Sequence, residues 1–176
     1  QIVSQYGGLL DIKISKNEKL NIKRIKIERN IENVIKNNFL LVYTKIKRYS
    51  SKIILSQKKR KSNIIKYYNE IKSFNNFILN SLKKNEVKNI GSIFNQHWKL
   101  KKSLSNQISD KKINNFYDNL LSNFNIFGGK LIGAGGGGFF LVCTNNKRKL
   151  KENLLKNNIN FIDFKIEKQG SIIIED

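Results

Sequence analysis

Residues 128–142, GGKLIGAGGGGFFLV, decide the fold. Five of the six positions from 133 to 138 are glycine. Glycine loses more backbone entropy on folding than any other residue, so such a run needs a physical reason. Without a Cβ atom, successive backbone amides can turn toward one concave spot, where a phosphate can lie against them. We therefore expect a phosphate-binding loop. The alternative is a plain hairpin connection, although two residues suffice to join adjacent strands.

Two common nucleotide-binding loops do not fit this stretch. The glycines at 133, 135 and 138 have the spacing of a dinucleotide fingerprint, but such a loop must open a helix, and the apolar run 139–142 is typical of a strand. A Walker A loop ends in Gly-Lys-Ser or Gly-Lys-Thr, whereas Phe139 and Phe140 stand here. The sequence therefore predicts a strand at 130–132, the loop at 133–138 and a strand at 139–144.

Apolar periodicity extends the prediction along the rest of the chain. We expect a hairpin from strands at 9–14 and 20–27 with one bulge, a short helix at 31–35, a strand at 39–44, and two long helices between 50 and 105 that break near 84–86. A third helix, capped by Ser109 or Asp110, would end near 127–129, and a helix at 146–156 and a strand at 161–166 would follow. The class is α+β. From Phe39 onward the order is that of a ferredoxin-like split β-α-β sandwich with additional helices.

The net charge is strongly positive. The 176 residues include 34 Lys and Arg against 13 Asp and Glu, a formal charge of +21. Such a balance is typical of proteins that bind a polyanion. However, abundant Lys, Asn and Ile without any Pro is the joint bias expected from a coding sequence rich in A and T. We interpret the basic run 58–61 as a solvated helix face, and keep a basic nucleic-acid-binding module as an alternative.

Cysteine and hydropathy narrow the protein class. Cys143 is the only cysteine and lies in the apolar run 139–143, which predicts a buried thiol with no disulfide. No stretch reaches the roughly 18 apolar residues that a membrane span needs. We expect a cytoplasmic protein with no membrane partner and one principal domain.

Four stretches together resemble one enzyme family. Residues 130–138 resemble the third signature motif of the GHMP kinases, the relatives of galactokinase, homoserine kinase, mevalonate kinase and phosphomevalonate kinase. Three more resemble the branch that phosphorylates D-glycero-D-manno-heptose 7-phosphate: residues 41–44 with Arg48, residues 97–105, and Ile108-Ser109. Residues 1–8 also resemble a segment that, in this branch, follows an Asp and ends in an aromatic residue and two glycines. The resemblance thus covers nearly the whole chain.

The resemblance implies an ATP-dependent kinase for a sugar hydroxyl, with heptose 7-phosphate as acceptor on the way to nucleotide-activated heptose. Galactose, fucose or mevalonate are alternative acceptors. The family's catalytic Asp would stand directly before Gln1, and the glycine loop that wraps the ATP phosphates is also outside the chain. We therefore expect a C-terminal fragment, inactive alone, with residues 1–36 from the N-terminal ATP-binding domain and 37–176 as the C-terminal domain. That missing N-terminal domain would be its partner and would bind most of the ATP and Mg²⁺.

The candidate site residues follow from the loop and from the charge of the acceptor. The phosphate loop comprises Gly133, Ala134, Gly135, Gly136, Gly137 and Gly138. An acceptor that already carries a phosphate needs cations, so Arg48, Lys101 and Lys102 are candidate substrate contacts, although each could be a solvated surface charge. Tyr6, beside the inferred base, could line the pocket or the core.

Three other residues are expected to have no direct part in binding or catalysis. His97 is expected to be a helix-surface or partly buried residue and not a metal ligand, since no Cys or second His is near. Trp98 is expected in the core, with a sugar-stacking role as the alternative. Lys45 stands where the family commonly has Gly after the Tyr-Thr pair, which makes the turn there uncertain and, with it, any role for Arg48.

Overall fold

The computed structural model describes residues 2–15, 17–47, 64–172 and 174. Its strands are β1 (Leu9–Ile14), β2 (Leu20–Ile25), β3 (Phe39–Tyr43), β4 (Gly128–Leu131), β5 (Phe139–Cys143) and β6 (Phe161–Ile162). Its helices are α1 (Ile2–Tyr6), α2 (Arg29–Asn38), α4 (Ile64–Lys83), α5 (Val87–Ser103), α6 (Lys111–Asn123) and α7 (Lys147–Lys156). The predicted α+β class is confirmed.

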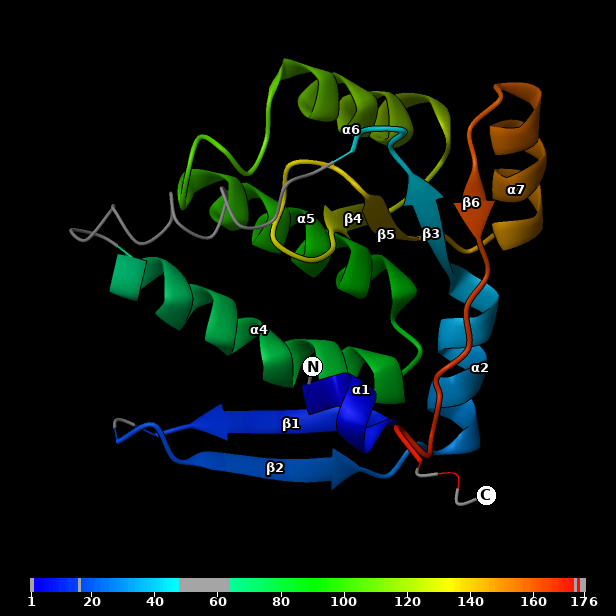
Figure 1. Ribbon diagram of the computed structural model, residues 1–176. Helices are drawn as coiled ribbons and strands as arrows, with labels where there is room; N and C mark the ends of the chain where they lie inside the picture. Colours follow the sequence, from blue (N-terminus) through cyan, green and yellow to red (C-terminus); the bar gives the residue numbers. More distant parts are fainter. Residues whose placement is uncertain (1, 16, 48–63, 173, 175–176) are drawn as a thin grey trace.

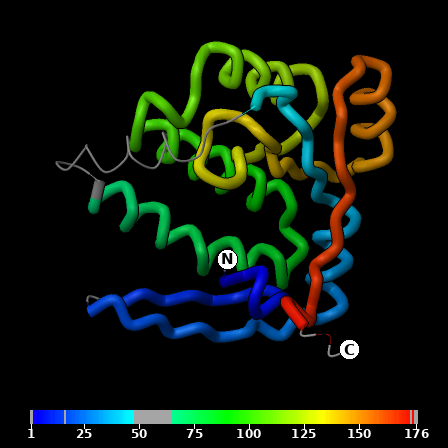
Figure 2. Tube along the Cα trace, in the orientation of Figure 1, coloured from blue at the N-terminus to red at the C-terminus, as the bar shows by residue number. Residues whose placement is uncertain are grey.

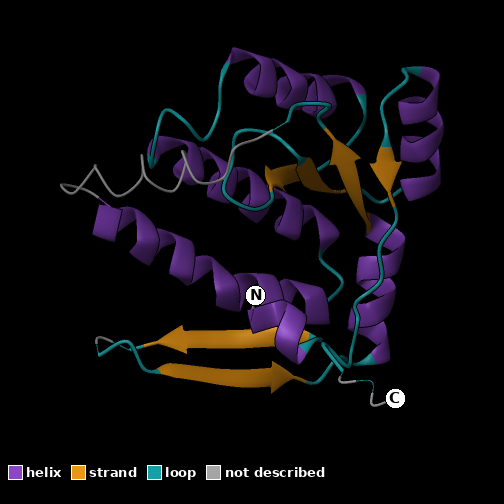
Figure 3. Ribbon diagram, viewed as in Figure 1, coloured by secondary structure: helices purple, strands orange, loops and turns teal. Residues whose placement is uncertain are grey.

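Strands β1 and β2 form a separate two-stranded antiparallel sheet (Figure 3). Their register is unbroken, from Leu9 opposite Ile25 to Ile14 opposite Leu20. The predicted bulge is therefore wrong, because every residue of one strand has one partner on the other. The second strand also ends earlier than predicted, at Ile25, and Ile27 packs beyond it against a buried apolar cluster.

The other four strands form one antiparallel sheet in the order β4-β5-β3-β6. Along the chain from β3 the order is strand, helices, strand, strand, helix, strand. The central strands β3 and β5 are apolar and mostly buried, as their continuous hydrophobic runs predict. Strand β6 has only two residues, so the predicted strand at 161–166 is too long: only Phe161 and Ile162 pair with β3.

Some helix boundaries agree with the prediction and others differ from it. The break between α4 and α5 falls at residues 84–86, as predicted, with Asn85 at a φ of 56°. Asp110 caps α6, because its carboxylate accepts a hydrogen bond of 2.8 Å from the amide of Ile113. The predicted end of α6 near 127–129 is wrong, since Gly128 and Gly129 already belong to β4. Helix α2 has ten residues, longer than the predicted 31–35.

Helix α6 ends at Asn123, and Asn125 has a left-handed φ of 53°; a close helix–strand contact then holds Gly128 in β4. A Cβ atom on Gly128 would lie 2.1 Å from the carbonyl oxygen of Gly91 in α5, so only glycine lets the strand pass. The hydroxyl of buried Tyr117 in α6 accepts from the amide of Gly129 at 2.8 Å and donates to its carbonyl at 2.9 Å. The backbone of β4, which leads into the glycine loop, is thereby fixed by two helices.

The helices separate the two sheets. In Figure 1, α4 lies beside the hairpin and α5 lies between α4 and the four-stranded sheet. One core cluster joins the sheet to α5, α6 and α7 and contains Trp98, Phe140 and Leu154. A second cluster joins α2, the ends of α4 and α5, and Phe39 of β3.

The C-terminal segment ties the hairpin end of the molecule to the sheet. Figure 2 shows it running from β6 along α2 to the first helix. The amide of Gly8 donates to the carbonyl of Glu167 at 2.6 Å, and the amide of Ser171 donates to the carbonyl of Gln5 at 3.3 Å. Gly7 and Gly170 pack so closely that a Cβ on Gly7 would lie 2.4 Å from the Gly170 nitrogen.

Candidate functional site

The glycine loop joins β4 to β5 and adopts backbone angles that other residues reach only with strain. Gly133, Gly135, Gly136, Gly137 and Gly138 all have positive φ, between 71° and 131°. These angles lie in or beyond the left-handed region, which costs a non-glycine residue roughly 1–2 kcal/mol. The run of glycines in the sequence is therefore required first by the path of the chain.

Residues 44–46 hold one side of the loop. The amide and the hydroxyl of Thr44 both donate to the carbonyl of Gly138, each at 2.9 Å, and the amide of Gly138 donates to the carbonyl of Ile46 at 3.1 Å. A Cβ on Gly137 would lie only 2.4 Å from that same Ile46 oxygen. Sequence reasoning missed Thr44 as a site residue, although a polar residue at the end of a buried apolar strand was a signal for it.

The turn before α6 holds the other side. The amide of Gly136 donates to the carbonyl of Ile108 at 2.8 Å, and a Cβ on Gly135 would lie 2.9 Å from the Ile108 Cα. The amides of Gly135 and Gly137 differ from those of Gly136 and Gly138. Within the described chain they donate to no protein acceptor, although both residues are buried. Buried amides normally have a partner. These two amides are thus the ones with capacity for a ligand.

Lys101 fixes the start of the loop. Its ammonium, on α5, donates to the carbonyl of Leu131 at 3.0 Å and to that of Gly133. The structure therefore brings Lys101 to the loop, but it places the charge on loop carbonyls.

Lys102 points elsewhere. Its ammonium donates to the side-chain oxygen of Asn114 in α6 at 3.0 Å and lies 5.6 Å from the Trp98 ring centroid. Adjacent positions of a helix face different directions, and the ammonium groups of Lys101 and Lys102 have different partners.

A second lysine raises the positive charge near the loop. Lys130, on β4, lies with its ammonium 5.5 Å from the Phe94 ring centroid, and burial lowers its pKa. Burial, followed by the charges of Lys130 and Lys101, lowers the pKa of His97 to about 4. His97 is therefore neutral at pH 7, and its buried Nδ1 has no hydrogen-bond partner in the described chain. Its partly buried position on a helix is as predicted.

Two core predictions are confirmed. Trp98 is 0% exposed and packs edge-on against Phe140 with ring centroids 5.4 Å apart, so it cannot offer a face to a sugar. Cys143 is also 0% exposed, and burial raises the pKa of its thiol to about 12. At neutral pH this thiol is protonated and unreactive.

The remaining candidates lie apart from the loop or outside the described residues. Tyr6 ends α1, is 41% exposed, and its carbonyl accepts a hydrogen bond from Arg24 of β2. This end of α1 contacts the hairpin and the C-terminal segment, and the structure does not join Tyr6 to the loop. Arg48 and the basic run 58–61 lie outside the described residues.

Residues 2–15, 17–47, 64–172 and 174 contain no group of three His, Cys, Asp or Glu side chains able to hold a metal ion. No helix in the same residues is long and apolar enough to cross a membrane.

Comparison with known proteins gives a consistent family of folds. No family model and no curated protein matches the sequence. A mevalonate kinase structure matches with a TM-score of 0.65 and 28% identity, over 93% of this chain and 49% of that one. A D-glycero-D-manno-heptose 1-phosphate kinase from Bacteroides thetaiotaomicron matches with a TM-score of 0.67 and 17% identity, over 99% of this chain and 48% of that one. The structures that this chain resembles are GHMP kinases.

A GHMP kinase in complex with ligands is among the matches. Streptococcus pneumoniae phosphomevalonate kinase with phosphomevalonate and AMPPNP has a TM-score of 0.59 and 18% identity, over 82% of this chain and 42% of that one. The predicted likeness to GHMP kinases is confirmed for the structural neighbours. The neighbours include kinases of mevalonate and of a heptose phosphate, so they do not select the acceptor. The chain spans about half the length of the first of these structures.

Proposed function

We propose that this chain is the C-terminal part of an ATP-dependent GHMP-type kinase that phosphorylates a hydroxyl of heptose 7-phosphate. One observation carries the proposal: stretches that resemble the family but lie far apart in the sequence meet at the glycine loop. Thr44 and Ile108 bond its backbone on two sides, and Lys101 bonds the carbonyl at its start. A plain hairpin connection would not need three separate segments to hold it.

The geometry suits phosphoryl transfer, in which the protein mainly positions groups and neutralises charge. The amides of Gly135 and Gly137 are the donors that could face a phosphate, while Lys101 and Lys130 add positive charge close by. ATP and Mg²⁺ would be held mainly by an N-terminal half, which would also supply the catalytic Asp directly before Gln1. Tyr6 and Arg48 are retained as candidate acceptor contacts, whereas Lys102, whose ammonium donates to Asn114, is assigned no contact with the acceptor.

The domain assignment belongs to the same proposal. Residues 1–36 would complete the ATP-binding domain, and the separate β1–β2 sheet supports this division. Residues 37–176 would form the C-terminal domain, for which the strand order β4-β5-β3-β6 supports a ferredoxin-like split β-α-β arrangement. The enzyme would act in the cytoplasm, and the fragment alone would be inactive.

Mevalonate is the second candidate acceptor. It is favoured by the 28% identity with a mevalonate kinase, against 17% with the heptose 1-phosphate kinase. The test is ADP release by the enzyme that contains this chain together with its N-terminal half, with heptose 7-phosphate, mevalonate and galactose offered separately. Turnover only with heptose 7-phosphate supports the first proposal, and turnover only with mevalonate supports the second. If no alcohol that can accept a phosphate supports ATP-dependent turnover, the kinase assignment is refuted.

Lys101 and Lys102 provide a matched pair in that enzyme. Lys101→Ala should raise the KM for the acceptor or lower kcat by about tenfold or more, since hydrogen bonds to a charged group contribute roughly 1.5–3 kcal/mol. Lys102→Ala removes the same charge but only a bond to Asn114, so acceptor kinetics should change less than about threefold. Lys101→Arg should restore part of the activity if the role is to position the loop. Equal effects of the two alanine variants would contradict the assignment of Lys101 to the loop.

A further inference from the structure

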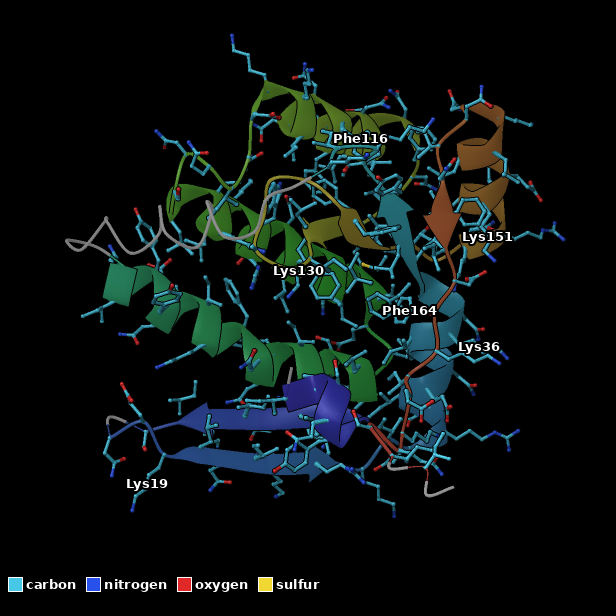
Figure 4. All side chains as sticks on the ribbon, viewed as in Figure 1. Lys19, Lys36, Phe116, Lys130, Lys151 and Phe164 are labelled. Carbon is cyan, nitrogen blue, oxygen red and sulfur yellow. The ribbon has the colours of Figure 1, made fainter. Side chains whose placement is uncertain are left out.

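A pocket of about 760 Å³ lies at the end of β5 opposite to the glycine loop. The loop precedes Phe139, whereas the pocket begins just after Cys143, so the length of β5 separates them. Five strand residues span roughly 17 Å at about 3.3 Å each. The walls are the end of α2, the start of α7 and the segment after β6, and its lining residues are Lys36, Asn37, Asn145, Asn146, Lys147, Arg148, Lys151, Asp163, Phe164 and Lys165. Figure 4 labels Lys36, Lys151 and Phe164 along this side of the molecule.

The lining is more basic than the composition of the chain explains. Five of its ten residues are Lys or Arg, whereas 34 of all 176 residues are. Asp163 is the single acidic residue of the lining. The content of Lys and Arg in the whole chain would place about two cations among ten residues. The pocket lining therefore has more Lys and Arg than this average.

The start of α7 adds to the positive potential. Its first residues are Lys147, Arg148 and Lys149, with no acidic residue in the first turn. The N-terminal end of a helix carries partial positive charge, so cations there destabilise the helix, and an anion relieves them. The Asn146 side chain caps the amide of Lys149 at 3.0 Å. In the described chain, the amides of Lys147 and Arg148 donate to no protein acceptor.

Asp163 neutralises only part of this charge. Lys147 is held at 2.6 Å from its carboxylate and donates to the carbonyl of Lys36 at 2.7 Å, and its side chain is only 12% exposed. Lys151 also pairs with Asp163. Burial works to raise the pKa of Asp163, but the hydrogen bonds and charges of the two lysines outweigh it and lower the pKa. One carboxylate thus serves two ammonium groups, and Lys36 and Lys165 add two more charges.

We propose that this pocket binds a small phosphorylated molecule with at least two negative charges, at a site distinct from the glycine loop. Its volume falls in the range of about 300–1,000 Å³ that small-molecule sites occupy. The amide side chains of Asn37 and Asn145 line the same space and can donate to phosphate oxygens. The pocket is recessed between two helices and a chain segment, which suits a compact ligand better than the continuous backbone of a nucleic acid.

Tripolyphosphate is the probe, titrated into the 176-residue chain by calorimetry at about physiological salt. Lys36→Gln/Lys165→Gln should weaken binding about tenfold or more, because it removes two cations from the pocket. The control, Lys19→Gln/Lys23→Gln, removes two exposed cations from the hairpin and should change affinity less than about twofold. Asp163→Asn should tighten binding, since it frees Lys147 and Lys151 for the ligand.

Several outcomes would overturn the proposal. Equal weakening by the pocket pair and the hairpin pair would mean that tripolyphosphate responds only to net charge. Weaker binding by Asp163→Asn would mean that Lys147 and Lys151 are not available to an anion in place of the carboxylate that they pair with. A short RNA oligomer that binds more tightly than tripolyphosphate, and loses its affinity in the pocket pair alone, would assign the pocket to nucleic acid instead. Saturable binding of one tripolyphosphate per chain, sensitive only to the pocket variants, would establish it.

Discussion

Replacing Gly137 by Ala tests whether the loop is held by the chain segment at 44–46. A Cβ on Gly137 would stand 2.4 Å from the Ile46 carbonyl oxygen, and its φ is +131°. Such backbone angles cost a non-glycine residue about 1–3 kcal/mol. To reach a tolerable separation the Ile46 carbonyl must move, which breaks or lengthens the 3.1 Å bond from the amide of Gly138 and costs about 1 kcal/mol more. The expected loss in the free energy of unfolding is therefore about 2–4 kcal/mol.

Gly136→Ala is the matched control, one residue away in the same loop. Its φ is +71°, which alanine reaches for about 1–2 kcal/mol. Urea unfolding of both variants gives the free energies, and amide hydrogen exchange reports the bond of Gly138 directly. We expect Gly137→Ala to be the less stable variant and to lose protection at the Gly138 amide. A Gly137→Ala variant as stable as Gly136→Ala, with that amide still protected, would refute the close packing on Ile46.

Two further predictions concern single residues near the loop. Lys45→Gly should change the free energy of unfolding by less than about 1 kcal/mol. It relieves the strain of a side chain at a φ of 58°, but it removes the hydrogen bond of 2.8 Å from the Lys45 ammonium to the carbonyl of Asn158. Thermal unfolding measures the change, and a fall of the midpoint by more than about 4 °C would contradict it. His97→Phe should flatten the fall in stability with acid: the pKa of His97 is lowered to about 4 from about 6.5 when unfolded, so the unfolded chain binds the proton first and stability falls as the pH drops from about 6.5 to 4. The full shift of the pKa corresponds to roughly 3 kcal/mol at 1.36 kcal/mol per unit, which is an upper value for a partly exposed ring. Identical dependence of the unfolding free energy on pH in the wild-type chain and in His97→Phe would contradict the prediction.

The order of elements was largely predictable because it depends on local pattern. The continuous apolar runs of β3 and β5, and the helical spacing of α4 and α5, are set by neighbours within a few residues. Where prediction failed, a distant contact had overridden local preference. Gly128 and Gly129 look like a helix stop, but Gly91 of α5 and Tyr117 of α6 draw them into β4.

The site was predictable in its parts and not in its geometry. The glycine run marked the loop, and the resemblance marked residues 41–44, 97–105 and 108–109. However, nothing local indicates that the amide of Gly136 bonds the carbonyl of Ile108 or that Gly138 bonds Ile46, since these partners lie far away along the chain. The separation of Lys101 from Lys102 follows from helix geometry, but their partners do not. Lys45 stands where the resemblance has Gly, and the structure gives it a φ of 58°, an angle that was not predicted from the sequence.

The glycines of the loop therefore combine two requirements that alternate along the backbone. Gly136 and Gly138 use their amides to bond the carbonyls of Ile108 and Ile46, which fixes the loop to the protein. A Cβ atom on Gly135 or Gly137 would collide with those same segments, and the amides of these two glycines have no acceptor in the described chain. A buried amide without a partner destabilises the folded chain by about 1–3 kcal/mol. An anion or a water molecule that accepts from these amides would remove this unfavourable contribution. The amides of Gly136 and Gly138 thus fix the loop to the protein, and those of Gly135 and Gly137 are the two that the proposed phosphate would bond.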